Sequence, residues 1–300
     1  MSFIEKLHKE FPLSQLAFSH SAGSAVVVAV DNIFATASIS LAGGHVLTWQ
    51  PKSSSEPVIW LSEQAKIALG KSIRGGVPVC WPWFGAHSSE PDYPAHGYVR
   101  TAAWQMVEAR QLDSGETQIT LELASDESVQ RFGPEGAQLR LSVTVGERLQ
   151  IALITTNDSG KSFELGEALH TYFHISDVAS VSVLGLDGVE YLDKVDDFAR
   201  KTQVAEIGFD GETDRVYLNT EADCIIDDKG LDRRIHIAKT GSASTVVWSP
   251  GLAKAEAMGD LGENDGWRKM VCVESANAAE NTLQIEAGTQ HCLSVEYWLS

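Results

Sequence analysis

The stretch that decides the fold is a pair of segments in the middle of the chain, LRLSVTV at residues 139–145 and LQIALIT at residues 149–155. In both segments the apolar residues occupy every second position, so one face is apolar and the opposite face is more polar. A period of two is typical of a half-buried β-strand. We therefore predict a half-buried strand in each segment.

Further strands are predicted on both sides of this pair, from near Val26 to Trp298. Similar apolar runs occur at residues 118–123, 181–183, 216–218, 224–226, 234–237, 245–248, 270–274 and 293–298. Turn signals such as Asn157-Asp158-Ser159-Gly160 separate them. Helices are expected to be few and short, at residues 1–11, 126–132 and 62–69. The first of these has the spacing of an amphipathic helix, with charged residues between Phe3, Ile4, Leu7 and Phe11.

The organisation of the chain points to one large domain. Three hundred residues could hold two domains of average size, but β-sandwiches and barrels reach roughly 250 residues as one unit. We find no Pro/Gly/Ser-rich linker, no change of composition along the chain and no repeat of 20 to 50 residues. We expect an all-β fold over residues 1–300, a large antiparallel sandwich of two packed sheets, with a closed barrel as the alternative.

Charge and composition exclude several classes of function. A net charge of −18 repels nucleic acid and acidic lipid surfaces, although a few arginines could still form a local pocket for a small phosphorylated ligand. The N-terminus has no signal-peptide pattern, and the strongest apolar run, Ala25 to Val30, is too short to cross a membrane. We expect a cytoplasmic protein with no membrane partner. The four cysteines form no C-x-x-C pair, which argues against a zinc site or a disulfide framework.

Two segments break the strand pattern and carry arginines. The first is IRGGVPVCWPWFG at residues 73–85, in which prolines and glycines interrupt an apolar run and Arg74 offers a planar fork for an anion. Trp81 and Trp83 could stack on a sugar or fill the core, and core packing is favoured. The second is HGYVR at residues 96–100, which we interpret as a loop leading into a strand. Arg74 and Arg100 together could bind a phosphate, but either could instead be a surface arginine paired with a carboxylate.

Three further candidates are a histidine and two carboxylates. His170 and His174 have the i, i+4 spacing of a metal pair on a helix, but on a strand they would lie roughly 13 Å apart, so we predict no metal there. Glu274 shares a face with Cys272 near the end of an apolar strand, where it could be a base with a raised pKa or only the solvated end of the strand. Asp214 is placed in an acidic loop before a strand.

Taken together, five motifs resemble the aldose 1-epimerase superfamily, and more narrowly its hexose-6-phosphate mutarotase branch. They are IRGGVPVCWPWFG at 73–85, HGYVR at 96–100, ALHTYF at 168–173, TDRVY at 213–217 and VCVESA at 271–276, and they span most of the chain in the family's order. The resemblance implies a galactose mutarotase-like β-supersandwich, no cofactor and no metal. The sequence departs from its relatives at Tyr98 and Val99, which leaves the preferred sugar open.

The same resemblance implies a role for each candidate residue. His170 matches the general acid and Glu274 the general base, Arg74 and Arg100 match the phosphate contacts, Asp214 matches a sugar-hydroxyl contact, and His96 is placed in the pocket. The expected partner is a small sugar phosphate, bound by a monomer, and the expected reaction is the exchange of its anomers. A non-catalytic carbohydrate-binding sandwich stays open as an alternative. So does a glycoside hydrolase or lyase, although hydrolases usually use paired carboxylates.

Overall fold

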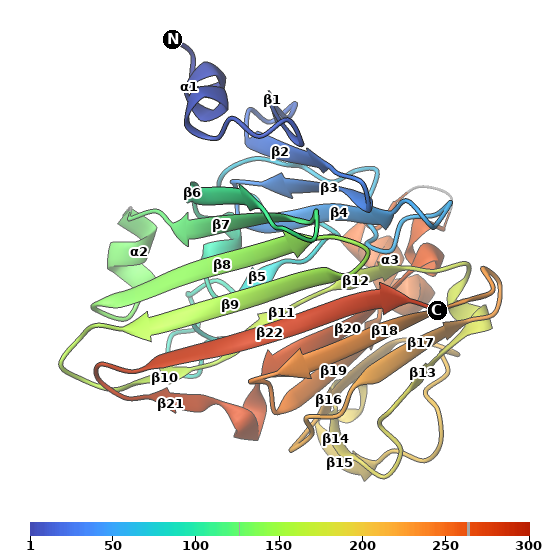
Figure 1. Cartoon of the computed structure of the whole chain (residues 1–300). Coiled ribbons are helices and arrows are strands. Elements are labelled where there is room, and N and C mark those ends of the chain that lie inside the picture. The colour runs from blue at the N-terminus through green and yellow to red at the C-terminus, as the bar shows by residue number, and fades with distance from the viewer. Residues whose placement is uncertain (126, 263–264) are drawn as a thin grey trace.

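The computed structural model describes residues 1–125, 127–262 and 265–300, and most of its regular structure is antiparallel β-sheet (Figure 1). One sheet of eight strands, called sheet I below, contains the two segments from which the fold was predicted. Its strands in spatial order are β13 (Val181–Leu184), β17 (Cys224–Asp228), β18 (Arg233–Thr240), β22 (Gln290–Leu299), β9 (Leu149–Asn157), β8 (Ala137–Val145), β7 (Thr117–Leu123) and β6 (Trp104–Gln111). Strands β8 and β9 pair as an antiparallel hairpin with Leu141 opposite Leu153, so the prediction of strands here is confirmed.

A second sheet of eight strands, called sheet II below, carries the candidate catalytic residues. Its strands in spatial order are β15 (Ala199–Thr202), β14 (Glu190–Asp193), β16 (Thr213–Tyr217), β19 (Ser244–Ser249), β20 (Met270–Asn277), β11 (Glu167–Leu169) and β5 (Val79–Cys80), and β12 (Tyr172–His174) also pairs with β20. The remaining strands form two small sheets, one of β1 (Leu16–His20), β2 (Val26–Asp31), β3 (Ala35–Ser40) and β4 (His45–Pro51), the other of β10 (Phe163–Leu165) and β21 (Leu283–Ile285).

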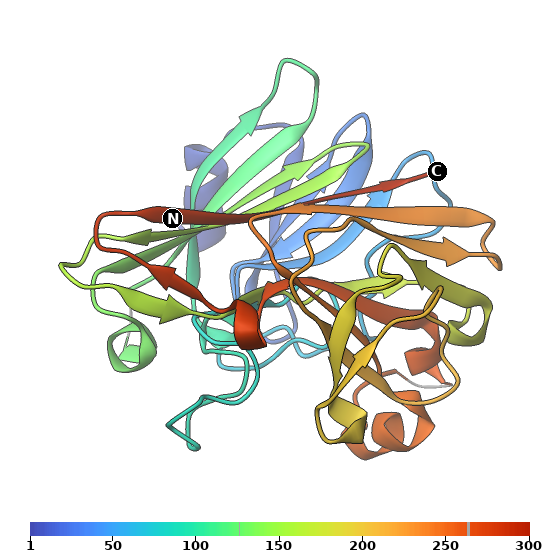
Figure 2. The ribbon, with the colours of Figure 1, turned by 90° about the horizontal axis from the view of Figure 1, so that it is seen from below.

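The two large sheets form separate layers. In Figure 2 the C-terminal strand β22 of sheet I is drawn in red across the molecule, and strands of sheet II lie below it. Alternate residues of β20 face opposite sides, as the sequence predicted. Val271 and Val273 join the main apolar core, whereas Cys272 belongs to a second buried cluster with Tyr172 and Trp248. Glu274 lies two residues after Cys272 on the same strand, so its side chain is on the same face and points away from the main core. The candidate site therefore lies on the side of sheet II that faces away from sheet I.

The helices are short, as expected, but their positions were only partly predicted. The α-helices are α1 (Phe3–Glu10), α2 (Glu127–Phe132) and α3 (Gly251–Met258), and the 3-10 helices are η1 (Val99–Thr101), η2 (Val178–Ser180), η3 (Lys194–Asp196), η4 (Gly266–Lys269) and η5 (Ala279–Asn281). The predicted helix at 62–69 is wrong, because Ser62 accepts a hydrogen bond from the backbone of Gln64 and donates one to the carbonyl of Asp260, which fixes a loop. Asp126 lies outside the described residues.

Other expectations from the sequence can be compared with the fold. The main apolar core includes side chains from Leu7 to Tyr297, which supports our proposal of one domain over residues 1–300. The all-β sandwich with few short helices is confirmed. All four cysteines are free, three of them buried and Cys292 exposed. Within the described residues, no helix is long and apolar enough to span a membrane.

Candidate active site

A pocket of about 420 Å³ opens on the outer side of sheet II, and all six candidate residues line it. The candidates come from distant parts of the sequence: Arg74, His96, Arg100, His170, Asp214 and Glu274. Strand β20 supplies Glu274, β16 supplies Asp214, and β11 ends one residue before His170. The fold thus brings together every residue that the sequence singled out for chemistry.

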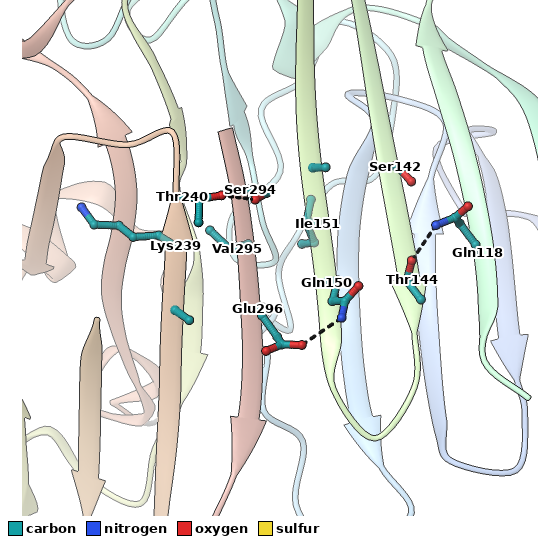
Figure 3. A pocket seen from close by; sticks show the side chains of 12 residues that line it. Gln118, Ser142, Thr144, Gln150, Ile151, Lys239, Thr240, Ser294, Val295 and Glu296 are labelled. Atoms are coloured by element: carbon teal, nitrogen blue, oxygen red, sulfur yellow. Dashed lines mark hydrogen bonds between the residues drawn. The ribbon is translucent and has the colours of Figure 1, made fainter. Parts of the chain in front are cut away.

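A second pocket lies on the outer face of sheet I and contains none of these candidates. Figure 3 shows that its polar side chains pair with one another: Gln118 with Thr144, Gln150 with Glu296, and Thr240 with Ser294. Lys239 points away from these side chains, and its ammonium group donates to oxygens of residues 220, 242, 244 and 245. This groove therefore offers no free acid and base.

His170 and Glu274 form the centre of the pocket on sheet II. His170 Nε2 lies 3.3 Å from Glu274 Oε1, and the side chain of Glu274 is only 1% exposed. Strand pairing fixes this contact, because Leu169 of β11 lies opposite Ser275 of β20. Glu274 lies inside β20, which continues to Asn277, so the alternative of a solvated strand end is wrong. Nδ1 of His170 is buried, which leaves Nε2 as the nitrogen that faces both Glu274 and the pocket.

Aromatic rings enclose the histidine. The phenol of Tyr172 stacks on the imidazole of His170, with centroids 5.1 Å apart and an interplanar angle of 16°. Trp248 and His96 make T-shaped contacts with the same imidazole, at centroid distances of 6.2 Å and 5.8 Å. These contacts remove water from around the ring and limit its rotation. Sequence reasoning did not identify Tyr172, although it lies within the ALHTYF motif.

Burial controls the protonation of the pair. It lowers the pKa of His170 well below 6.5, and His96, Arg100 and Arg74 lower it further. Burial also raises the pKa of Glu274 well above 4.5, and nearby Asp214 adds to the rise while Lys194 opposes it. Because both charged forms are disfavoured, burial favours a neutral imidazole facing a protonated carboxyl group. The two residues share one proton, as an acid and base pair requires.

Four cationic side chains line the pocket although the chain carries a net charge of −18. The Nε of Arg74 pairs with Asp260 Oδ1 at 3.0 Å, and Lys194 pairs with Asp214 Oδ2 at 2.9 Å. Lys254 pairs with Glu212. Arg100 donates to the carbonyl of Ala95 at 2.8 Å and makes no ion pair with a carboxylate in the described part of the chain.

Sequence reasoning missed Lys194 and Lys254. Lysines in polar segments are common, and neither has a local signal that would have marked it. Lys254 lies on α3, the helix that was not predicted, although Pro250 and Gly259 at its ends are start and stop signals. Lys194 begins η3, directly after β14.

Several smaller expectations are corrected by the structure. HGYVR leads into the 3-10 helix η1, not directly into a strand. Asp214 is not in a loop but inside β16, where it is 9% exposed. Trp81 is a core residue that donates to Thr155 Oγ1, and Trp83 packs against the loop side chains of His87 and Tyr93. Core packing is therefore confirmed for Trp81, whereas Trp83 is only partly buried and packs against the core.

Comparison with known proteins identifies the family. Residues 26–298 match the family model described as aldose 1-epimerase. This chain belongs to the aldose 1-epimerase family. It is 39% identical over 255 residues to an Escherichia coli K12 protein named "Putative glucose-6-phosphate 1-epimerase", and the match covers 85% of this chain and 84% of that protein.

Solved structures agree with this family assignment. A crystal structure from Salmonella typhimurium, described as a "putative mutarotase", has a TM-score of 0.88 and 32% identity, with 98% of this chain and 99% of that chain covered. A galactose mutarotase-like protein from Clostridium acetobutylicum shares the fold, with a TM-score of 0.70 at 12% identity over 95% of this chain and 98% of that one. The resemblance inferred from the five motifs is confirmed, and so is the galactose mutarotase-like sandwich.

Metal binding is disfavoured at the centre of this epimerase site. His170, Cys272 and Glu274 offer a nitrogen, a sulfur and an oxygen atom within 4.8 Å of one another. However, burial raises the pKa values of both Cys272 and Glu274 in the metal-free protein, so a metal ion would have to displace a proton from each group. Arg74 and Arg100 would also repel a cation. We therefore assign no metal to these residues.

Gly97 fixes the segment that carries His96 and Arg100, and its substitution provides a test of that geometry. Its φ is +72°, and an added Cβ would lie 1.8 Å from the carbonyl oxygen of Trp81. Gly97→Ala is expected to lose more stability than the roughly 1–2 kcal/mol that a left-handed non-glycine residue costs. Displacement of the two side chains should also lower kcat by about 10-fold or more. Denaturant unfolding and the rate of anomer exchange measure both effects.

The matched control is Gly188→Ala. Gly188 has a φ of +77°, but an added Cβ would meet nothing within 4 Å. It therefore carries the same backbone cost without the collision. Two results together would contradict this geometry: Gly97→Ala is no less stable than Gly188→Ala, and it is as active as the wild-type protein. The segment at 96–100 would then not be held as the structure shows.

Proposed function

We propose that this epimerase interconverts the α and β anomers of a hexose 6-phosphate, with glucose 6-phosphate as the first candidate. The observation that carries the proposal is the buried His170–Glu274 contact of 3.3 Å in a pocket that also gathers four cations. The name of the Escherichia coli relative supports the same substrate. An acid and a base fit the chemistry at C1, and the cations fit a phosphate at C6.

The reaction needs one proton removed and one proton added. Glu274, as carboxylate, takes the proton from the anomeric hydroxyl while His170 Nε2 donates a proton to the ring oxygen, and the bond between C1 and the ring oxygen breaks. The aldehyde rotates about its bond to C2, and the same two groups with exchanged roles close the ring on the other face. Neither residue is permanently changed. A positioned acid or base contributes typically 10²- to 10⁴-fold.

The cations act on a part of the substrate that does not react. Arg100 has no carboxylate partner among the described residues, and Arg74 has only its Nε and Nη1 engaged by protein groups. Both can therefore make charge-assisted hydrogen bonds to a phosphate. Such remote binding orients the sugar while the chemistry occurs at C1. Asp214, held by Lys194, lies at a position where it can accept a hydrogen bond from a sugar hydroxyl.

The direct test follows the approach to anomeric equilibrium of freshly dissolved α-glucose 6-phosphate, with and without protein, beside the same measurement on α-glucose. We expect acceleration that is much greater for the phosphorylated sugar. Equal acceleration of both sugars would contradict the phosphate role and leave a general aldose epimerase. Binding without acceleration would favour a carbohydrate-binding module, and release of reducing sugar from an oligosaccharide would favour a hydrolase.

A further inference from the structure

Three rings form a column that ends at the catalytic histidine. Trp60 stacks on Tyr172 with centroids 5.9 Å apart and an interplanar angle of 23°, and Tyr172 stacks on His170 at 5.1 Å. Trp248 makes T-shaped contacts with both Tyr172 and His170. Tyr172 is 3% exposed, so its position is set by packing on several sides. The middle ring of the column is therefore held more firmly than a free pocket side chain would be.

Arg74 is attached to the same column. Its Nη1 donates to the hydroxyl oxygen of Tyr172 at 3.1 Å, and its Nε donates to Asp260 at 3.0 Å. These bonds use two of the five N–H donors of the guanidinium group. The others stay available to an anion in the pocket. Tyr172 thus contacts two residues with proposed roles. Its hydroxyl contacts Arg74, which would bind the phosphate, and its ring face contacts His170, the proposed general acid.

The charges around His170 favour its neutral form while the pocket is empty. The groups that face it are Glu274 and Cys272 on β20, His96 and Arg100 from the segment at 96–100, Arg74 and Tyr172. After burial, the largest effects that lower the pKa of His170 come from His96, Arg100 and Arg74. Burial raises the pKa of Tyr172, which keeps the phenol protonated, so Tyr172 positions its neighbours and relays no proton.

We propose that the substrate's own phosphate switches the catalytic pair into its working form, and that Tyr172 is the positioning residue that couples Arg74 to His170. This inference rests on the proposed function. A phosphate monoester is largely dianionic at neutral pH and cancels the charges of Arg74 and Arg100 when it binds between them. The proton then moves from the carboxyl group of Glu274 to Nε2 of His170. One O–H bond breaks, one N–H bond forms, and the products are the carboxylate base and the imidazolium acid that the reaction needs.

The coupling explains why a phosphorylated sugar would react faster and not only bind more tightly. Without the phosphate, the proton stays on Glu274. Glu274 then cannot act as the base, and His170 cannot act as the acid, in the first step. With it, the binding energy of a group remote from C1 changes the protonation of the residues at C1. The phosphate therefore contributes to kcat as well as to KM.

The first experiment compares two ligands that differ only in the phosphate. The probes are 1,5-anhydroglucitol 6-phosphate and 1,5-anhydroglucitol, which lack the anomeric hydroxyl and cannot turn over. The titration of His170 is followed by NMR of ¹⁵N-labelled imidazole, with His236 on sheet I as the internal control. We expect the phosphorylated probe to raise the titration midpoint of His170 by about one pH unit or more, as the removal of two nearby positive charges implies. The unphosphorylated probe and His236 should show no such rise.

The second experiment tests Tyr172 by a split between kcat and KM. Tyr172→Phe keeps the ring in the column and removes only the hydroxyl contact with Arg74. We expect kcat with glucose 6-phosphate to fall about 10-fold, while KM changes less than about 3-fold because Asp260 still holds Arg74. Tyr297→Phe is the matched control, since Tyr297 is also buried and its hydroxyl bonds to Thr171 Oγ1 at 2.7 Å, outside the pocket. It should change stability but not kcat.

The outcomes separate this inference from the proposed function. If the midpoint of His170 does not move while the phosphorylated probe is bound, or if Tyr172→Phe matches Tyr297→Phe in kcat, the coupling is wrong even though glucose 6-phosphate is turned over. If glucose 6-phosphate is not turned over at all, the proposed function itself fails. If the phosphorylated probe does not bind, the phosphate role fails and the coupling fails with it.

Discussion

Glu274→Gln is expected to lower kcat for anomer exchange by about 10³-fold or more while the fold survives, because a positioned base typically contributes 10²- to 10⁴-fold. The glutamine has nearly the same shape but cannot take a proton from the anomeric hydroxyl. The wild-type carboxyl group is held protonated by burial at the centre of β20, so a neutral amide should fit there without a charge to compensate. Exchange of the anomers of glucose 6-phosphate, observed by NMR at equilibrium, gives the rate.

The control for this variant is Glu167→Gln. Glu167 is also fully buried in sheet II, but its Oε1 pairs with His291 Nε2 at 2.8 Å and it does not line the pocket. Its substitution should lower the free energy of unfolding and leave kcat close to that of wild type. A Glu274→Gln protein that is folded by circular dichroism and keeps more than a tenth of the wild-type kcat would rule out Glu274 as the base.

Arg100→Gln is expected to raise KM for glucose 6-phosphate by about 10- to 100-fold, the range implied by the loss of charge-assisted hydrogen bonds worth roughly 1.5–3 kcal/mol. Turnover of free glucose should not fall, because Arg100 faces the proposed phosphate position and contributes nothing to C1 except a charge that disfavours the imidazolium of His170. Removal of Arg100 leaves no carboxylate of the described protein unpaired, so the stability should change little. Initial rates with the two sugars measure the difference.

The charge-matched control is Arg110→Gln. Arg110 is exposed on β6 and bonds to Gln118 on the neighbouring strand. Its substitution removes the same unit of charge at a position that does not line the pocket. If it raises KM as much as Arg100→Gln does, the effect comes from the overall charge of the protein. If Arg100→Gln impairs glucose and glucose 6-phosphate equally, the arginine does not select for the phosphate.

Much of the sheet architecture could be predicted because a β-strand carries a local signal. The alternation at 139–145 and 149–155 gave strands in the right places, and the same period of two placed Glu274 on the face opposite Val271 and Val273. The helix at 251–258 was missed because its Ala-rich sequence has no clear apolar face to mark it. The predicted helix at 62–69 failed because Ser62 forms side-chain bonds that fix a loop.

The candidate residues were identified from motifs, but their relation to one another is a property of the tertiary structure. The sequence by itself determined a β-rich chain with strong negative charge and the residues His170, Glu274, Arg74 and Arg100 as chemistry-bearing groups. Only the fold decided that Lys194 and Lys254 join the pocket and that Tyr172 contacts both Arg74 and His170. The physical reason is that strand periodicity acts over two residues, whereas the pairing of β11 with β20 joins positions about a hundred residues apart, and burial at that junction sets the protonation of the pair.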